Sequence, residues 1–210
     1  MEALGGYPTK TTAQKSRMFT VLFSLMVSVG CLFLLQTKLA KSRKPKDLYS
    51  FEVKDAKGRT VSLERYRGKV SLVVNVASHS EHTELNYRAL QDLHKELGTS
   101  HFNVLAFPCG QYGETEPGNS YDIESFAKTT YGVTFPFFSK IKILGSDPNP
   151  AFKFITDSVQ KVPRWNFWKF LVNPEGKVVR FWRPEENILS VREEAVSLVR
   201  DIILKKRVEL

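Results

Sequence analysis

The pattern of apolar and polar positions after residue 47 predicts a series of strands. Residues 51–63 (FEVKDAKGRTVSL) alternate between apolar and polar side chains around a D-A-K-G turn, which is typical of a β-hairpin. Residues 70–77 (VSLVVNVA) and 102–108 (FNVLAFP) are almost continuously apolar, as expected for strands that are covered on both faces. A second hairpin is predicted over residues 169–182, around the turn N-P-E-G.

Apolar residues at helical spacing separate these strands. One helix is predicted after the first buried strand, with Ser78 and Glu81 as its capping box and with apolar positions at Leu85, Ala89, Leu90, Leu93 and Leu97. Further helices are expected over residues 122–131 and 151–158, with an extended segment at 133–138. A closing amphipathic helix carries Val191, Ala195, Leu198, Val199 and Ile202. This order of elements predicts an α/β domain with a mixed central sheet and helices on both faces.

A separate apolar segment lies near the N-terminus. Residues 18–35 (MFTVLFSLMVSVGCLFLL) contain no charge and are long enough, at the short end of the range, to span a hydrocarbon core of roughly 30 Å. A secretory signal peptide is the alternative, because basic residues precede the run, but the run exceeds a usual signal core and TKLAKS is a poor cleavage site. We therefore predict an N-terminal tail (1–17), a transmembrane anchor in membrane lipid (18–35), a basic linker (36–46) and a folded domain (47–210).

Two signals for the orientation of this anchor disagree. More Lys and Arg residues follow the apolar segment than precede it, which by charge alone favours a cytosolic domain. The last four residues, RVEL, partly match the KDEL retrieval signal, which is read in the lumen of the endoplasmic reticulum, although Val208 stands where an acid is expected. We favour a single-pass protein of the endoplasmic reticulum with its C-terminal domain in the lumen.

Charge and cysteine content limit the classes of function. The net charge of +9 comes from basic residues that are spread along the chain, with local density beside the apolar segment and in LKKR near the C-terminus. This distribution favours a membrane-proximal surface, and the sequence has no nucleic-acid-binding motif. The only cysteines are Cys31, inside the apolar segment, and Cys109, so a structural disulfide framework is excluded. Cys109 is the one thiol available to soluble chemistry.

Polar segments follow or precede the predicted central strands where active groups of α/β sheets gather. They are SHSE (78–81), PCGQYG (108–113) and PRWNF (163–167). The candidate site residues in these segments are Ser80, Gln111, Trp165 and Asn166.

Several motifs in a fixed order resemble the glutathione peroxidase family. They are NVAS, FPC-x-Q-x-G-x-x-E-P, YGVTFP, PRWNFWKFLV and NPEGKVV, within residues 48–204. The resemblance implies a thioredoxin fold, and the anchor and tail make the chain most similar to membrane-anchored members of the endoplasmic reticulum. It also implies that a cysteine or selenocysteine attacks the peroxide beside a Gln, a Trp and an Asn, which correspond to Gln111, Trp165 and Asn166.

The same resemblance implies the reactants. Hydrogen peroxide or small hydroperoxides are the expected oxidants, and no bound cofactor is expected. Glutathione or a dithiol protein, such as one like protein disulfide isomerase, is the expected reductant. The chain departs from the family at the decisive position, because Ser80 stands where the nucleophilic cysteine belongs. Gly110 also replaces the Asn that many members have between the Cys and the Gln.

These departures leave two hypotheses. An oxygen cannot replace sulfur in the oxidation to a sulfenic acid, so activity is expected to be weak or to depend on Cys109 as a substitute thiol. The alternative is a catalytically inactive, membrane-tethered binding or regulatory protein. In the simplest structural interpretation, Ser80 caps the following helix and Cys109 is a small buried residue. His79 and His82 have a metal-like spacing but lack further ligands, so no metal site is expected.

Overall fold

The computed structural model describes residues 23–32 and 47–208, which belong to two compact units, Met1–Lys44 and Pro45–Leu210. In the first unit, residues 23–32 form a helix whose side chains are exposed. Within the described ranges, no helix combines the length and the apolar character needed to cross a membrane. The predicted tail, the predicted linker, the two ends of the predicted anchor and the last two residues of RVEL lie outside the described residues.

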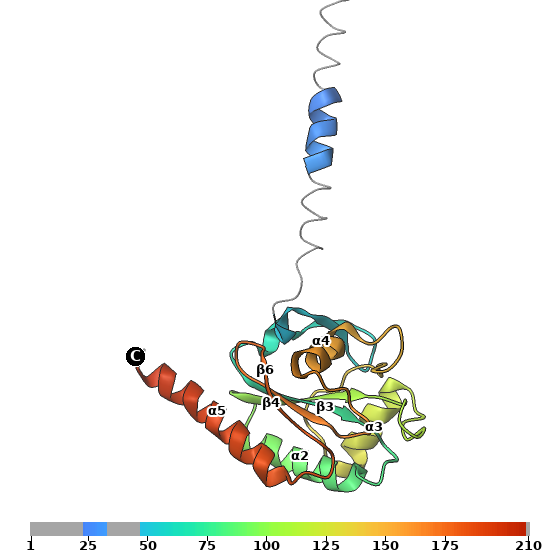
Figure 1. Ribbon diagram of the computed structural model, residues 1–210, viewed down its shortest axis with the longest axis vertical. Coiled ribbons are helices and arrows are strands. Elements are labelled where there is room, and N and C mark those ends of the chain that lie inside the picture. The colour runs from blue at the N-terminus through green and yellow to red at the C-terminus, as the bar shows by residue number, and fades with distance from the viewer. Residues whose placement is uncertain (1–22, 33–46, 209–210) are drawn as a thin grey trace, which may run out of the picture. The chain divides into compact units, whose positions relative to one another are not determined.

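The central sheet of the second unit has the strand order β4-β3-β5-β6 (Figure 1). The parallel pair consists of β3 (Val70–Val76) and β4 (Phe102–Pro108). Antiparallel to β3 runs β5 (Lys169–Val172), which continues through the N-P-E-G turn into β6 (Val178–Trp182). Every residue of β3, β4 and β5 is buried, which confirms the two predicted apolar strands. The antiparallel pairing of β5 with β6 confirms the predicted second hairpin, and the combination of parallel and antiparallel pairs confirms the mixed sheet.

The N-terminal part of the domain forms the other predicted hairpin. Its strands are β1 (Glu52–Lys54) and β2 (Thr60–Ser62), which pair antiparallel between the short helices η1 (Leu48–Ser50) and η2 (Leu63–Tyr66). The backbone N–H of Leu48 donates a hydrogen bond of 2.9 Å to the carbonyl oxygen of Gly176. This bond fixes the start of the domain to the turn between β5 and β6.

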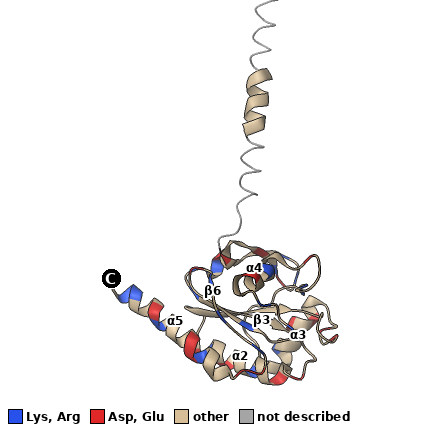
Figure 2. Cartoon of the chain, in the orientation of Figure 1, with Lys and Arg blue, Asp and Glu red and all other residues tan. Residues whose placement is uncertain are grey.

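Helices cover both faces of the sheet, as predicted (Figure 1). One face packs against α2 (Thr83–Leu97), α3 (Ser120–Tyr131) and α5 (Ile188–Val208), and the other packs against α4 (Pro150–Val159). Because strand residues alternate between faces, Leu72, Val74 and Val76 lie in the first core, whereas Val73 lies in the second. Residues 133–138 are extended and carry isolated bridges to the sheet region. The last turn of α5 contains Lys205, Lys206 and Arg207, and the C-terminal end of this helix is coloured blue for basic residues in Figure 2.

The start of α2 differs from the prediction. The expected capping box of Ser78 and Glu81 is wrong, because the helix begins at Thr83, and its N-cap residue, His82, makes no capping side-chain bond. Thr83 Oγ1 accepts a hydrogen bond from the Ser80 N–H (2.9 Å) and donates one to the carbonyl oxygen of Ala77 (2.9 Å). These bonds form a turn that delays the helix. Leu85, expected in the core, is 72% exposed, because the buried face of α2 carries Asn86, Tyr87 and Leu90 instead.

Candidate active site

The three predicted loops meet beyond the ends of β3 and β4. The backbone N–H of His79 donates to the carbonyl oxygen of Thr115 (2.9 Å), and Asn166 Nδ2 donates to Thr115 Oγ1 (2.6 Å). Thr115 therefore connects the loop of Ser80 to the loop of Asn166. No sequence motif singled out Thr115, because its role depends on contacts between distant segments.

Asn75 holds the loop before β5 against β3. It is fully buried, and its side-chain Nδ2 donates a hydrogen bond to the carbonyl oxygen of Trp165 (3.0 Å). Its backbone carbonyl oxygen accepts a hydrogen bond from the N–H of Phe167 (2.7 Å). Phe167 has φ of 63°, a left-handed conformation that is uncommon for an aromatic residue. Such a conformation persists only where neighbours enforce it, and Asn75 supplies that constraint. The signal in the sequence was an amide residue inside a strand whose only other polar residue is Ser71.

Ser80 closes the turn before α2. It is 7% exposed, and its Oγ accepts a hydrogen bond from the backbone N–H of His82 at 3.3 Å. The expected capping role of Ser80 is therefore wrong, because the bonded amide belongs to His82, the N-cap residue, and not to the first turn of α2. In the described part of the chain, no basic side chain bonds to this hydroxyl. A serine without a neighbouring base is a poor nucleophile.

The side chain of Gln111 forms hydrogen bonds with another loop, at residues 143–144. Its Oε1 accepts the N–H groups of Ile143 (2.6 Å) and Leu144 (2.8 Å), and its Nε2 donates to the carbonyl oxygen of Leu144 (3.0 Å). Among the described residues, no hydrogen bond joins Gln111 to Ser80 or its neighbours. The amide therefore stabilises the 143–144 loop, and its assignment as a site residue stays a prediction.

Trp165 and Asn166 present polar atoms that the protein leaves unpaired. Trp165 Nε1 and Asn166 Oδ1 are buried and have no hydrogen-bond partner among the described residues. The indole ring lies against Gly113, where an added Cβ would be 2.9 Å from the ring, and its centroid is 6.5 Å from that of Tyr112. One donor and one acceptor beside the same loop thus have no partner among the described residues, which is uncommon for buried polar atoms.

Cys109 follows β4 and is fully buried. Burial raises the pKa of its thiol, although the backbone N–H groups of Gln111 and Ile143 and the charge of Lys140 oppose this shift. Its Sγ lies 3.8 Å from Gln111 Oε1. Because the thiolate is the reactive form, a buried thiol of raised pKa is a weak nucleophile.

Glu116 is a buried carboxyl beside the same loops, and no sequence pattern had marked it as a site residue. Its side chain is 1% exposed, and burial raises its pKa to about 7 against the opposing effects of Ser78 and Lys140. Neither oxygen has a hydrogen bond of good geometry within the described residues. This carboxyl can therefore hold or release a proton near neutral pH. The sequence contained the residue in E-T-E-P, but nothing in it indicated burial.

Lys140 occupies the space that an Asn at position 110 would need. Its Nζ donates to the carbonyl oxygens of Glu116 and Gly118. A Cβ at Gly110 would lie 2.8 Å from Lys140 Cε and 2.9 Å from the carbonyl oxygen of Glu116. The absence of a side chain at Gly110 thus leaves room for the side chain of Lys140.

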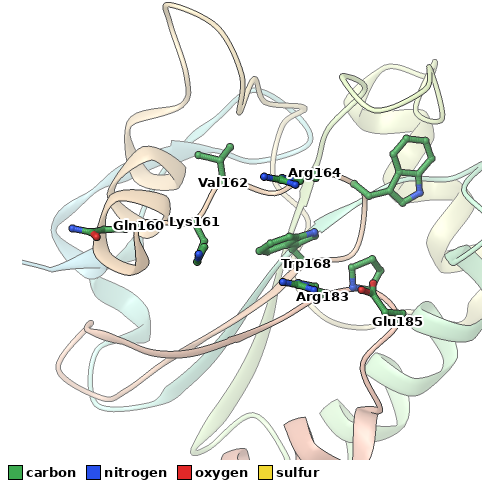
Figure 3. Close-up of a pocket in the computed structure, with 9 residues that line it drawn as sticks. Gln160, Lys161, Val162, Arg164, Trp168, Arg183 and Glu185 are labelled. Atoms are coloured by element: carbon green, nitrogen blue, oxygen red, sulfur yellow. The ribbon is translucent and has the colours of Figure 1, made fainter.

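A cavity of about 560 Å³ lies beside Trp165 (Figure 3). Its cationic lining residues are Lys161, Arg164 and Arg183, and its aromatic ones are Trp165 and Trp168; Glu185 is the acidic one. Cations around an aromatic wall suit a small molecule that carries negative charge. Within residues 23–32 and 47–208, no group of three or more His, Cys, Asp and Glu side chains is placed to hold a metal ion.

Comparisons with known proteins identify relatives of the whole chain. The family profile described as Glutathione peroxidase matches residues 48–156. A protein of Tetraodon nigroviridis named "Probable glutathione peroxidase 8" is 74% identical over 210 residues, and a human protein of that name is 59% identical; each comparison covers 100% of both chains. The crystal structure of T. cruzi GPX1 is 26% identical with a TM-score of 0.62, and the match covers 73% of this chain and 97% of that one. These matches confirm the thioredoxin-like fold.

Proposed function

The chain belongs to the glutathione peroxidase family, and we propose that it is an oxidoreductase of that family which reduces hydroperoxides weakly with a thiol donor. The observation that supports this proposal is the set of hydrogen bonds that holds the loops of the site together. Asn75 and Thr115 hold the Trp165–Asn166 segment beside the loop of Ser80, with a donor and an acceptor left for a bound peroxide. The activity is weak because residue 80 lacks the sulfur that the reaction needs.

Cys109 is the thiol that serves in this proposal. Its thiolate attacks one peroxide oxygen, so that an S–O bond forms, the O–O bond breaks and the leaving oxygen takes a proton, which gives a sulfenic acid and an alcohol or water. An external thiol condenses with the sulfenic acid and releases water, and a second one restores Cys109 and leaves as a disulfide. The domain has no other cysteine, so both reducing equivalents come from outside.

The cavity beside Trp165 supports an anionic donor. Glutathione carries two carboxylates, and a dithiol protein like protein disulfide isomerase can present acidic side chains. Lys161, Arg164 and Arg183 complement either kind of charge, and none of the ion pairs among the described residues engages them.

The proposed location is the membrane of the endoplasmic reticulum, with the domain in the lumen. The uncharged run 18–35 and the tail RVEL support this location. A glycosylation acceptor added at the C-terminus tests it. Modification in cells is the expected result, whereas an unmodified tag in a membrane-inserted protein would contradict the lumenal placement.

The activity is tested with the full chain in detergent micelles. Hydrogen peroxide consumption is measured with glutathione or with a reduced dithiol protein, for the parent and for Cys109→Ser. Slow turnover that disappears in Cys109→Ser supports the proposal. Turnover that persists in the variant would remove Cys109 from the mechanism.

A second candidate function is a membrane-tethered binding protein without catalysis. The engagement of Ser80 in a turn and the full burial of Cys109 favour it. In that case neither form consumes peroxide above the protein-free rate, and the parent still binds the dithiol protein in a pull-down from purified components.

A further inference from the structure

Lys169, the first residue of β5, is a buried lysine. Its side chain is 1% exposed, and its Nζ donates a hydrogen bond of 3.0 Å to the carbonyl oxygen of Phe167. None of the ion pairs among the described residues includes it. A buried ammonium normally requires a counter-ion or several acceptors, so this position is costly for a lysine that serves only packing.

The lysine lies in the wall of a cavity of about 460 Å³. Strand alternation places Lys169 on the same face of β5 as Leu171, toward α2 and α5. The cavity lies between the start of α2 and the segment that joins β6 to α5. Apolar side chains from both segments form much of its lining: Leu85, Ala89, Pro184 and Ile188.

The surroundings favour the uncharged amine. Burial lowers the pKa of Lys169 to about 8, while Glu186 and Glu185 oppose the shift. The titratable groups that face the cavity are those two carboxylates, from the segment after β6, and His82, from the start of α2. At pH 7 a lysine of pKa about 8 has about two-hundredfold more neutral amine than an ordinary lysine of pKa about 10.4. The neutral amine is the nucleophilic form.

We propose that Lys169 is a covalent modification site, which forms an imine with aldehydes that carry a short hydrocarbon chain. The amine nitrogen adds to the carbonyl carbon and gives a carbinolamine. A C=N bond then forms as the C–O bond breaks, and the aldehyde oxygen leaves as water with the two amine protons. No oxidant, reductant or cofactor is needed. The apolar lining holds the hydrocarbon chain, and the site is independent of peroxide reduction.

The test uses the full chain in detergent micelles at pH 7, with hexanal and sodium cyanoborohydride, which converts the imine into a stable secondary amine. Peptide mass mapping gives the rate of alkylation at each lysine, and the exposed Lys57 and Lys177 serve as internal standards. We expect Lys169 to react at least about tenfold faster than either standard, because more of its amine is neutral at this pH. A rate at or below that of the standards would overturn the proposal.

Two further measurements distinguish the contribution of the cavity to alkylation of Lys169 from the intrinsic reactivity of its amine. Ala89→Phe fills the cavity, and we expect it to reduce alkylation of Lys169 at least about fivefold while Lys57 is unaffected, because aldehydes reach the buried amine through this space. Formaldehyde, which has no hydrocarbon chain, is expected to give a lower ratio of Lys169 to Lys57 alkylation than hexanal in the parent protein. An equal ratio for the two aldehydes would refute recognition of the chain, and this readout does not depend on any variant folding.

Discussion

Glu116 makes the stability of the domain depend on pH in a direction that can be worked out. Its folded-state pKa is about 7, above the ordinary value of 4.5, because its side chain is 1% exposed. The folded protein therefore binds this proton more tightly than the unfolded chain does. The resulting stability is fully present below pH 4.5 and is lost as the pH rises through about 7. This difference in pKa corresponds to ~3 kcal/mol.

Glu116→Gln removes the titration and keeps the shape of the side chain. We expect the free energy of unfolding of the variant, relative to that of the parent, to increase by ~3 kcal/mol between pH 4.5 and pH 8, so that the variant becomes the more stable protein. The gain appears at high pH, where the parent must bury a carboxylate. Urea denaturation of the full chain, followed by tryptophan fluorescence at several pH values, measures the difference.

Glu52→Gln is the matched control, since Glu52 is an exposed glutamate on β1. Its free energy of unfolding is expected to follow that of the parent at every pH. If the free energy of unfolding of Glu116→Gln also differed from that of the parent by the same amount at every pH, burial would not hold the carboxyl protonated, and the reasoning would fail.

The contacts of the loops lead to three other predictions. Ser80→Cys is expected to raise peroxide consumption at least about tenfold over the parent, measured with a thiol donor, because a thiolate would then face the retained loops; unchanged activity would mean that the site lacks more than its sulfur. Thr115→Val is expected to lower the free energy of unfolding by about 1–3 kcal/mol in urea, because Asn166 Nδ2 loses its acceptor, and a loss below the error of the measurement would contradict this role. Gly110→Ala is expected to lower the melting temperature, since the new Cβ would lie 2.9 Å from the backbone oxygen of Glu116; an unchanged or higher value would show that Lys140 and the loop adjust freely.

The sequence predicted the elements whose signals are local. Continuous apolar runs marked β3 and β4, and the turn residues between β5 and β6 marked a hairpin, because both patterns reflect burial and backbone geometry within a few residues. The predicted start of α2 was wrong because it depends on the bond from Thr83 Oγ1 to Ala77, which no propensity encodes. Leu85 lies inside α2 but is exposed, because its face of the helix is not the one that packs against the sheet.

The chemistry of the site was less predictable because it depends on long-range contacts. The bonds of Gln111 go to residues 143 and 144, more than thirty positions away in the chain, and those of Asn75 go to residues 165 and 167. Glu116 and Lys169 both lie within motifs that resemble the family, but no pattern in the sequence indicated that they are buried, since charged residues are exposed in most proteins. For Trp165 and Asn166, the resemblance to a family was the signal that raised a site role above simple packing.

The framework of the site does not depend on the residue at position 80. Thr115 bonds to the backbone N–H of His79, Thr83 bonds to the backbone N–H of Ser80, and Asn75 fixes the loop before β5. The only bond that the Ser80 side chain makes with the described residues is a long one, 3.3 Å, to the N–H of His82. Exchange between oxygen and sulfur at this position is therefore expected to cost little stability. For the same reason, the activity of Ser80→Cys reports on the remaining groups of the site and not on a rearranged loop.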